Sequence, residues 1–205
     1  AVAYACHPDA WGVQIVFDNQ VILGTRARKT RTKSFNAFSS IDYPETAMFR
    51  DRRLIQFLQR PADYTHAVFS TALDPNVFVL RLVPGMRADI IPMLEGRYRA
   101  LVLESFGVGG IPQRLMDAFA EELGDYDKTH KILILTTQVT YEGSDVGIYE
   151  VGKRVKNRFR FLEAHDMTIE AVVTKVMWLL AQNCENFDQL QQRFYRQINF
   201  DTFYH

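Results

Sequence analysis

Two polar loops that follow apolar segments contain the residue types needed to bind a small ligand. The first, residues 104–112, places Gly107 and two further glycines before a proline, and the second, residues 136–143, includes Thr137 and Gln138. Glycine allows tight backbone turns, and free N–H groups at such a turn can hold a carboxylate or another anion. Together these loops predict a site for a small polar ligand.

The glycine spacing of the first loop does not match a dinucleotide-binding loop. In that motif the third glycine stands three residues after the second, whereas Gly110 follows Gly109 directly. Spacing alone also allows a tight strand-to-helix turn without any ligand. Ser105 lacks the Gly-x-Ser-x-Gly context of an exposed nucleophile, so we do not expect it to act as one.

A basic run provides the candidate for proton transfer. Five positive charges, Arg26, Arg28, Lys29, Arg31 and Lys33, occupy eight consecutive positions. A charge run is usually a solvated surface, and composition leaves that alternative open. A lysine near a threonine and a carboxylate can instead assist proton removal from a hydroxyl nucleophile, which is weak until a base activates it. Lys29 is the residue to which this role could fall.

Composition restricts the partners and the compartment. Lysine plus arginine balance aspartate plus glutamate at 24 each, so no net field attracts the chain to nucleic acid or to a membrane. Cys6 and Cys184 have no paired spacing for a disulfide framework or a zinc site, and the histidines are scattered without ligand spacing. With no apolar run near the roughly 20 residues that span a bilayer, we expect a soluble protein of a reducing cytoplasm.

The first sixty residues have the pattern of a domain fragment. Residues 1–6 resemble the middle of a helix and lack a capping residue, which indicates a truncated start. Apolar runs at residues 13–17 and 21–23, with a short polar turn between them, predict a β-hairpin. Residues 39–74 are irregular and predict a linker. We therefore expect residues 1–60 to be the remnant of one α/β domain and residues 61–205 to form a second α/β domain.

The second domain alternates short apolar strands with helices. Strands are expected at residues 77–82, 100–103 and 131–135, helices at residues 88–94 and 112–123, and two longer helices after Asp166, which can cap the first of them. Nearly continuous apolar strands that alternate with helices indicate a parallel sheet covered on both faces. The expected fold is a Rossmann-like parallel sheet with helices on both faces, preceded by a β-hairpin fragment.

Four ordered blocks resemble one enzyme family. Residues 24–29, 35–40, 107–109 and 166–175 have the order and approximate spacing seen in type I, cytoplasmic-type L-asparaginases. This resemblance covers most of the chain. It implies a homodimeric or homotetrameric amidohydrolase that converts L-asparagine into L-aspartate and ammonia with a threonine nucleophile and without metal or cofactor.

The resemblance also assigns roles to residues. Lys29 matches the catalytic lysine of the family, which acts with a Thr-Asp pair beside a second threonine; those residues precede the segment where this chain begins. We therefore expect the isolated chain to lack a complete site and to be inactive. The positions implied to contact substrate or effector are Arg28, Glu104, Ser105, Gly107, Thr137 and Gln138.

The sequence leaves two other functions open. One is a regulatory or oligomerisation module that binds an amino acid between the loops of Ser105 and Thr137 without chemistry. The other is the asparaginase-like subunit of a tRNA-dependent amidotransferase, which shares the fold. The sequence does not decide between asparagine and glutamine as substrate.

The resemblance yields one prediction about regulation. Regulated type I members hold asparagine as effector with an arginine after the second strand and a cysteine after the third, where this chain has Glu104 and Val139. Glu104 would repel the effector's carboxylate unless Arg28 compensates, and Val139 offers no hydrogen bond. The full-length enzyme should therefore give a hyperbolic curve of rate against asparagine concentration. A sigmoid curve that becomes hyperbolic on Glu104→Ala would contradict this interpretation.

Overall fold

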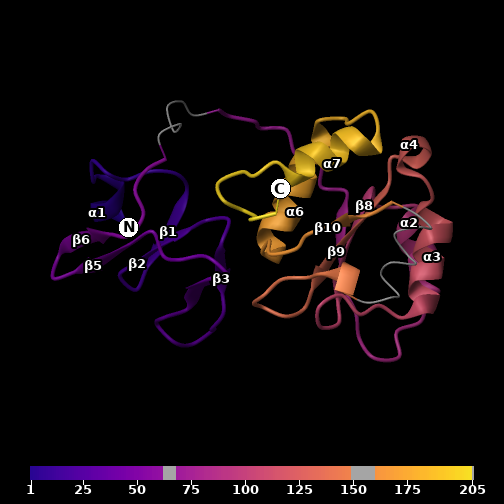
Figure 1. The fold of residues 1–205 in the computed structure, drawn as a ribbon, viewed down its shortest axis with the longest axis horizontal. Helices are drawn as coiled ribbons and strands as arrows, with labels where there is room; N and C mark the ends of the chain where they lie inside the picture. The colour runs from indigo at the N-terminus through magenta and orange to yellow at the C-terminus, as the bar shows by residue number, and fades with distance from the viewer. Residues whose placement is uncertain (62–67, 149–159, 205) are drawn as a thin grey trace. The chain divides into compact units, whose positions relative to one another are not determined.

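The chain forms two compact units. The computed structural model describes residues 1–61, 68–148 and 160–204 (Figure 1). Unit 1 comprises Ala1–Thr71 together with Ile198–Asp201, and unit 2 comprises Ala72–Gln197 together with Thr202–His205. The end of the chain therefore supplies a short turn to the unit in which the chain begins.

Unit 1 contains a four-stranded antiparallel sheet. Its strands are β1 (Gln14–Phe17), β2 (Gln20–Leu23), β5 (Ala47–Arg50) and β6 (Arg53–Gln56), in the order β1-β2-β5-β6. Both hairpins turn on two residues with positive φ, Asp18 and Asn19 in one and Asp51 and Arg52 in the other. Two such residues match the twist of the paired strands. The predicted hairpin is thus confirmed, with β1 and β2 as its strands.

The expectation of an irregular linker from residue 39 onward is wrong for part of that segment. β5 pairs with both β2 and β6 and completes the sheet. The polar turn of Asp51 and Arg52 and the exposed arginines beside it hide the strand pattern, because a strand that faces solvent on one side needs few apolar residues.

A second, smaller sheet in unit 1 is a two-stranded ribbon. β3 (Ala27–Lys29) pairs antiparallel with β4 (Phe38–Ser40), with Ala27 opposite Ser40, Arg28 opposite Ser39 and Lys29 opposite Phe38. The unit begins with one turn of helix, α1 (Val2–Ala5), which no side chain caps. The basic run of residues 26–33 therefore follows β3 and continues into the loop after it.

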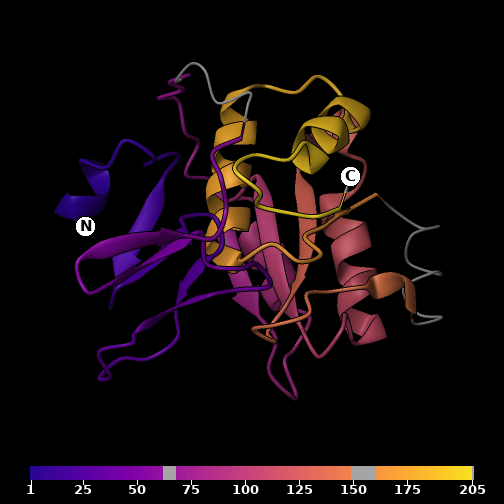
Figure 2. The same ribbon diagram turned by 60° about the vertical axis from the view of Figure 1, so that its left-hand side comes forward.

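Unit 2 is built on a parallel sheet. Its strands β7 (Val77–Arg81), β8 (Ala100–Ser105), β9 (Ile132–Thr137) and β10 (Leu162–Glu163) lie side by side in chain order. The helices are α2 (Ile90–Glu95), α3 (Gln113–Leu123), α4 (Tyr126–Thr129), α6 (Ile169–Ala181) and α7 (Phe187–Tyr195), and Val146–Ile148 forms a 3-10 turn (Figure 2). None of the described helices has the length and apolar character needed to cross a bilayer.

The two central strands of this sheet are buried on both faces. Every residue of β8 and β9 is buried. Residues such as Val102 and Ile134 pack with α6 and α7, whereas their neighbours Leu103 and Leu135 pack with α2 and α3. Alternate side chains of a strand point to opposite faces, so each helical layer has its own core. The expected parallel sheet with helices on both faces is confirmed.

The predicted cap of the first C-terminal helix is wrong. The hydroxyl of Thr168, two residues after Asp166, accepts a hydrogen bond from the backbone N–H of Ala171 (3.2 Å) and caps α6. The carboxylate of Asp166 instead accepts hydrogen bonds from the hydroxyl of Thr202 (2.7 Å) and the N–H of Phe203 (3.0 Å). Helical geometry begins only at Ile169, so Asp166 lies too far from the helix to cap it. Its carboxylate instead holds the segment of Thr202 and Phe203.

Two glycines of unit 2 allow the cost of backbone strain to be measured apart from the cost of steric overlap. Gly143 and Gly85 both have positive φ, but a Cβ on Gly143 would lie 2.4 Å from the carbonyl oxygen of His165, whereas one on Gly85 would meet nothing within 4 Å. We predict that Gly85→Ala lowers the free energy of unfolding by about 1 kcal/mol. Gly143→Ala should lower it by about 3 kcal/mol or more, since the backbone at His165 must also shift. Urea unfolding measures both, and equal losses would contradict the described approach of the two segments.

Candidate functional site

The β3–β4 ribbon presents Lys29 to solvent. Lys29 is the last residue of β3 and lies opposite Phe38, so both side chains leave the ribbon on the same face. Its Nζ lies 6.0 Å from the centroid of the Phe38 ring, at the limit of a cation–π contact. Beside it, the hydroxyls of Thr30 and Ser39 are 2.8 Å apart and form a hydrogen bond. Lys29 is therefore exposed to solvent, and it lies on a strand that is paired with β4.

A buried arginine anchors the start of this ribbon. The Arg26 side chain has no exposure to solvent, and its Nε donates a hydrogen bond to the carbonyl oxygen of Phe200 (2.5 Å). Its guanidinium carbon lies 5.4 Å from the centroid of the Tyr43 ring. The backbone carbonyl of Arg26 accepts a hydrogen bond from the N–H of Ile41 (2.9 Å), which closes the ribbon at this end.

The partner of Arg26 belongs to the short turn that the chain end contributes to unit 1. Asn199 and Phe200 both adopt the left-handed backbone region, with φ of 49° and 58°. The Phe200 ring contacts those of Trp11 and Tyr43, with centroids 6.2 Å and 5.7 Å away. The hydroxyl of Thr25 adds a hydrogen bond to the carbonyl oxygen of Asn199 (2.6 Å). Packing thus fixes a turn that an isolated chain would rarely adopt.

Nothing in the sequence distinguishes Arg26 from the other charges of the basic run. It is one of five cations in eight positions, and a basic run is more often solvated than buried. Its carbonyl acceptor lies 174 residues away in the chain. The sequence pattern therefore predicts no role for Arg26, although the structure makes it the anchor of the strand that carries Lys29.

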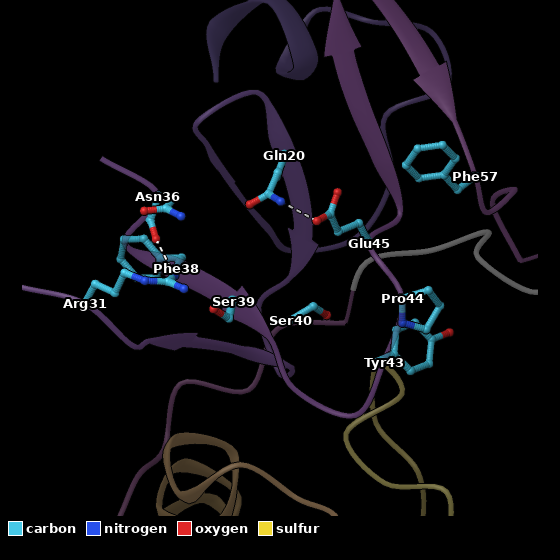
Figure 3. Close-up of a pocket in the computed structure, with 10 residues that line it drawn as sticks. All are labelled: Gln20, Arg31, Asn36, Phe38, Ser39, Ser40, Tyr43, Pro44, Glu45 and Phe57. Carbon is cyan, nitrogen blue, oxygen red and sulfur yellow. Dashed lines mark hydrogen bonds between the residues drawn. The ribbon is translucent and has the colours of Figure 1, made fainter. Parts of the chain in front are cut away.

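A pocket of about 520 Å³ opens beside β4 (Figure 3). Its lining residues come from β2, from the β3–β4 ribbon and its loop, from the segment before β5 and from the residue after β6. They are Gln20, Arg31, Asn36, Phe38, Ser39, Ser40, Tyr43, Pro44, Glu45 and Phe57. The Gln20 amide donates a hydrogen bond to the Glu45 carboxylate. Burial raises the pKa of the Glu45 carboxyl, because the charged form loses contact with water.

The remaining predicted positions gather at the carboxyl edge of the sheet in unit 2. The hydroxyl of Ser105, which is fully buried, donates to the carbonyl oxygen of Thr136 (2.6 Å), and the hydroxyl of Thr137 donates to that of Gly107. The Gln138 amide donates to the backbone carbonyls of Leu82 (2.7 Å) and Glu104 (3.0 Å). In this structure these side chains tie the loops together through backbone oxygens.

The division of the chain separates the predicted positions. Lys29 and Arg28 lie on β3 in unit 1, whereas Glu104, Ser105, Gly107, Thr137 and Gln138 lie in unit 2. The structure brings the members of each group together within their unit. Their roles toward a substrate or an effector stay predictions.

Comparison with known proteins establishes the family. The family model described as "Glutaminase/Asparaginase C-terminal domain" matches residues 76–194, more than half of the chain, and that described as "Asparaginase, N-terminal" matches residues 1–62. The chain belongs to the glutaminase/asparaginase family. The resemblance to asparaginases is thereby confirmed.

Relatives within the glutaminase/asparaginase family include enzymes and amidotransferase subunits. The L-asparaginase of Thermococcus kodakarensis is 34% identical over 188 residues, which are 89% of this chain and 55% of that protein. The solved structure of the thermostable L-asparaginase from Thermococcus kodakarensis superposes with a TM-score of 0.88 at 31% identity, covering 98% of this chain and 60% of the other. A glutamyl-tRNA(Gln) amidotransferase subunit of Metallosphaera sedula is 27% identical over 79% of this chain and 37% of the relative. The chain therefore spans about half the length of the L-asparaginase it matches.

The anchoring of the ribbon can be tested by substitution. Arg26→Met keeps much of the side-chain volume but removes the charged donor to Phe200, and hydrogen bonds to charged groups contribute about 1.5–3 kcal/mol. We predict a loss of that size in unit 1 and faster amide hydrogen exchange at Ala27–Lys29, with β8 of unit 2 unchanged. Arg53→Met, at an exposed arginine of β6, is the control. Unchanged exchange in β3 of the Arg26 variant would show that the ribbon does not depend on this contact.

Proposed function

We propose that this chain is part of an L-asparaginase that hydrolyses L-asparagine to L-aspartate and ammonia. The observation that supports this most is that a single chain matches both the N-terminal and the C-terminal model of the family. A relative named L-asparaginase at 34% identity adds to it. Lys29 stands where the family motif has its lysine, on a paired strand and with its side chain exposed.

In the proposed reaction Lys29 moves a proton. A threonine hydroxyl attacks the side-chain amide carbon of asparagine, its proton passes to a base, and ammonia leaves after the nitrogen is protonated. Water then hydrolyses the acyl-enzyme ester and releases aspartate. A lysine amine can accept and return that proton when it is neutral. We propose that the threonine nucleophile and the Thr-Asp pair lie outside residues 1–205, and that this chain alone is inactive.

The proposed assembly follows the same resemblance. We infer a homodimer or homotetramer that acts in the cytoplasm on a small-molecule substrate, with no nucleic-acid or membrane partner and no metal or cofactor. The equal numbers of acidic and basic residues support a small neutral or zwitterionic substrate over a polyanion. Arg28, Glu104, Ser105, Gly107, Thr137 and Gln138 are the positions proposed to contact substrate or effector.

The amidotransferase relatives support a second candidate function. The match to the Metallosphaera sedula protein covers 79% of this chain, and another glutamyl-tRNA(Gln) amidotransferase subunit, from Methanobrevibacter smithii, is 24% identical over 78% of it. In that case the amide would come from glutamine and would be transferred to an acceptor. Ammonia release from asparagine and from glutamine, measured on the same protein, separates the two candidates. Preference for asparagine supports the asparaginase proposal, and preference for glutamine supports the second.

A substitution at Lys29 tests the proposed mechanism. In the protein that includes the residues preceding Ala1, Lys29→Ala should lower kcat by about 10²- to 10⁴-fold, the usual contribution of general acid–base groups. Lys33 belongs to the same basic run but lies outside the family motif, so Lys33→Ala should leave kcat nearly unchanged. The 205-residue chain should release no more ammonia than its own Lys29→Ala variant. Activity of the chain above that control would contradict the proposed division of the site.

A further inference from the structure

The pocket beside β4 contains one cation and one anion, and neither has an ion-pair partner among the residues that the structure describes. Arg31 uses one donor for the backbone carbonyl oxygen of Asn36 (3.0 Å), and a guanidinium has five N–H donors. Glu45 accepts a hydrogen bond from the neutral amide of Gln20. Figure 3 shows Arg31 and Glu45 on different walls of the same space. The pocket thus has two opposite charges that a ligand could satisfy.

The two charges stand on an ordered frame. Glu45 directly precedes Thr46, which is fully buried and whose N–H donates to the carbonyl oxygen of Val21 (2.9 Å). Gln20, which orients the carboxylate, is the first residue of β2. Arg31 directly follows the hydrogen-bonded Thr30, and its N–H donates to the carbonyl oxygen of Ala37 (3.2 Å). Hydrogen bonds therefore fix the backbone at or directly beside both residues.

Charge balance decides what kind of ligand fits. A phosphate or sulfate would bring negative charge toward Glu45, and a polyamine would bring positive charge toward Arg31, so each would be repelled by one wall. A molecule with one carboxylate and one ammonium satisfies both. The ammonium would also relieve the desolvated Glu45 carboxylate, and the carboxylate could take two donors of the guanidinium.

We propose that this pocket binds a free α-amino acid with a bulky apolar side chain, its carboxylate on Arg31 and its ammonium on Glu45. The volume of about 520 Å³ lies within the range of roughly 300–1,000 Å³ of small-molecule sites. Phe38, Tyr43 and Phe57 belong to a lining that is otherwise mostly polar, and their rings are the surface available to the ligand's side chain (Figure 3). Ser40, also in the lining, has a hydroxyl oxygen without a partner among the described residues.

This site differs from the proposed site of hydrolysis. Lys29 is not among its lining residues, and its preferred ligand has an apolar side chain rather than the amide of asparagine. Binding here requires neither a nucleophile nor turnover. Loss of asparagine hydrolysis would therefore leave binding at this pocket unchanged.

Titration of the 205-residue chain with three related probes tests the proposal. L-Phenylalanine carries both charges, N-acetyl-L-phenylalanine lacks the ammonium, and L-phenylalaninamide lacks the carboxylate. We expect calorimetry to show saturable binding of L-phenylalanine. NMR spectra should show shifts of the backbone amide resonances of Gln20, Ser39 and Glu45. Each single-charge probe should bind about 10- to 100-fold more weakly, the effect of losing one charged hydrogen bond.

Matched variants connect each charge of the ligand to its residue. Glu45→Gln should weaken binding of L-phenylalanine and abolish its preference over the N-acetyl form, and Arg31→Gln should abolish its preference over the amide. The controls Asp51→Asn and Arg53→Gln make the same changes at exposed positions outside the lining and should leave affinity unchanged. Absence of saturable binding at millimolar concentration, or undiminished affinity in both pocket variants, would overturn the proposal.

Discussion

A charged side chain without access to water holds together the part of the molecule on which both functional proposals rest. Burial of an unpaired guanidinium would be costly, so Arg26 requires the carbonyl oxygen of Phe200 and the face of Tyr43. Those contacts fix the beginning of β3. A ribbon of two three-residue strands has too few hydrogen bonds to be stable alone. The positions of Lys29 on one strand and of Ser39 and Ser40 on the other therefore depend on this buried contact.

Unit 2 obeys a different constraint. Its central strands are covered on both faces, so the middle of each must be apolar, and polar side chains are placed at the strand ends. Ser105 and Thr137 are such residues. Their hydroxyls, donated to backbone carbonyl oxygens, join neighbouring loops at the edge where parallel α/β sheets bind ligands. A ligand at this edge would compete with those internal hydrogen bonds.

The fold of unit 2 could be predicted from the sequence because its signal is local. Runs such as Ile132–Leu135 are apolar at every position, and a short run of this kind between helical segments is typical of a strand buried on both faces. The hairpin β5–β6 could not be recognised because four consecutive charged residues, Arg50, Asp51, Arg52 and Arg53, interrupt its apolar residues. Asp166 is a plausible cap of α6 because a capping side chain is common at several positions before a helix, and geometry alone selects Thr168.

The candidate site divides in the same way. Lys29 could be found from its sequence motif, since the motif is contiguous. The burial of Arg26 could not, because its acceptor is 174 residues away. The pocket of Arg31 and Glu45 could not be predicted either, because its lining comes from separate segments of the chain, and the sequence does not show which side chains meet. Long-range pairing is thus the information that the sequence alone did not provide.

The proposed function depends on proton transfer by the Lys29 amine during amide hydrolysis. Chemical rescue tests it most directly: the Lys29→Ala variant of the protein that includes the residues preceding Ala1 is assayed for aspartate formation while small primary amines are added. We predict that the lost activity returns in proportion to amine concentration and rises with amine basicity, while the wild-type protein does not respond. A variant as active as the wild-type protein without any added amine would contradict this role of Lys29.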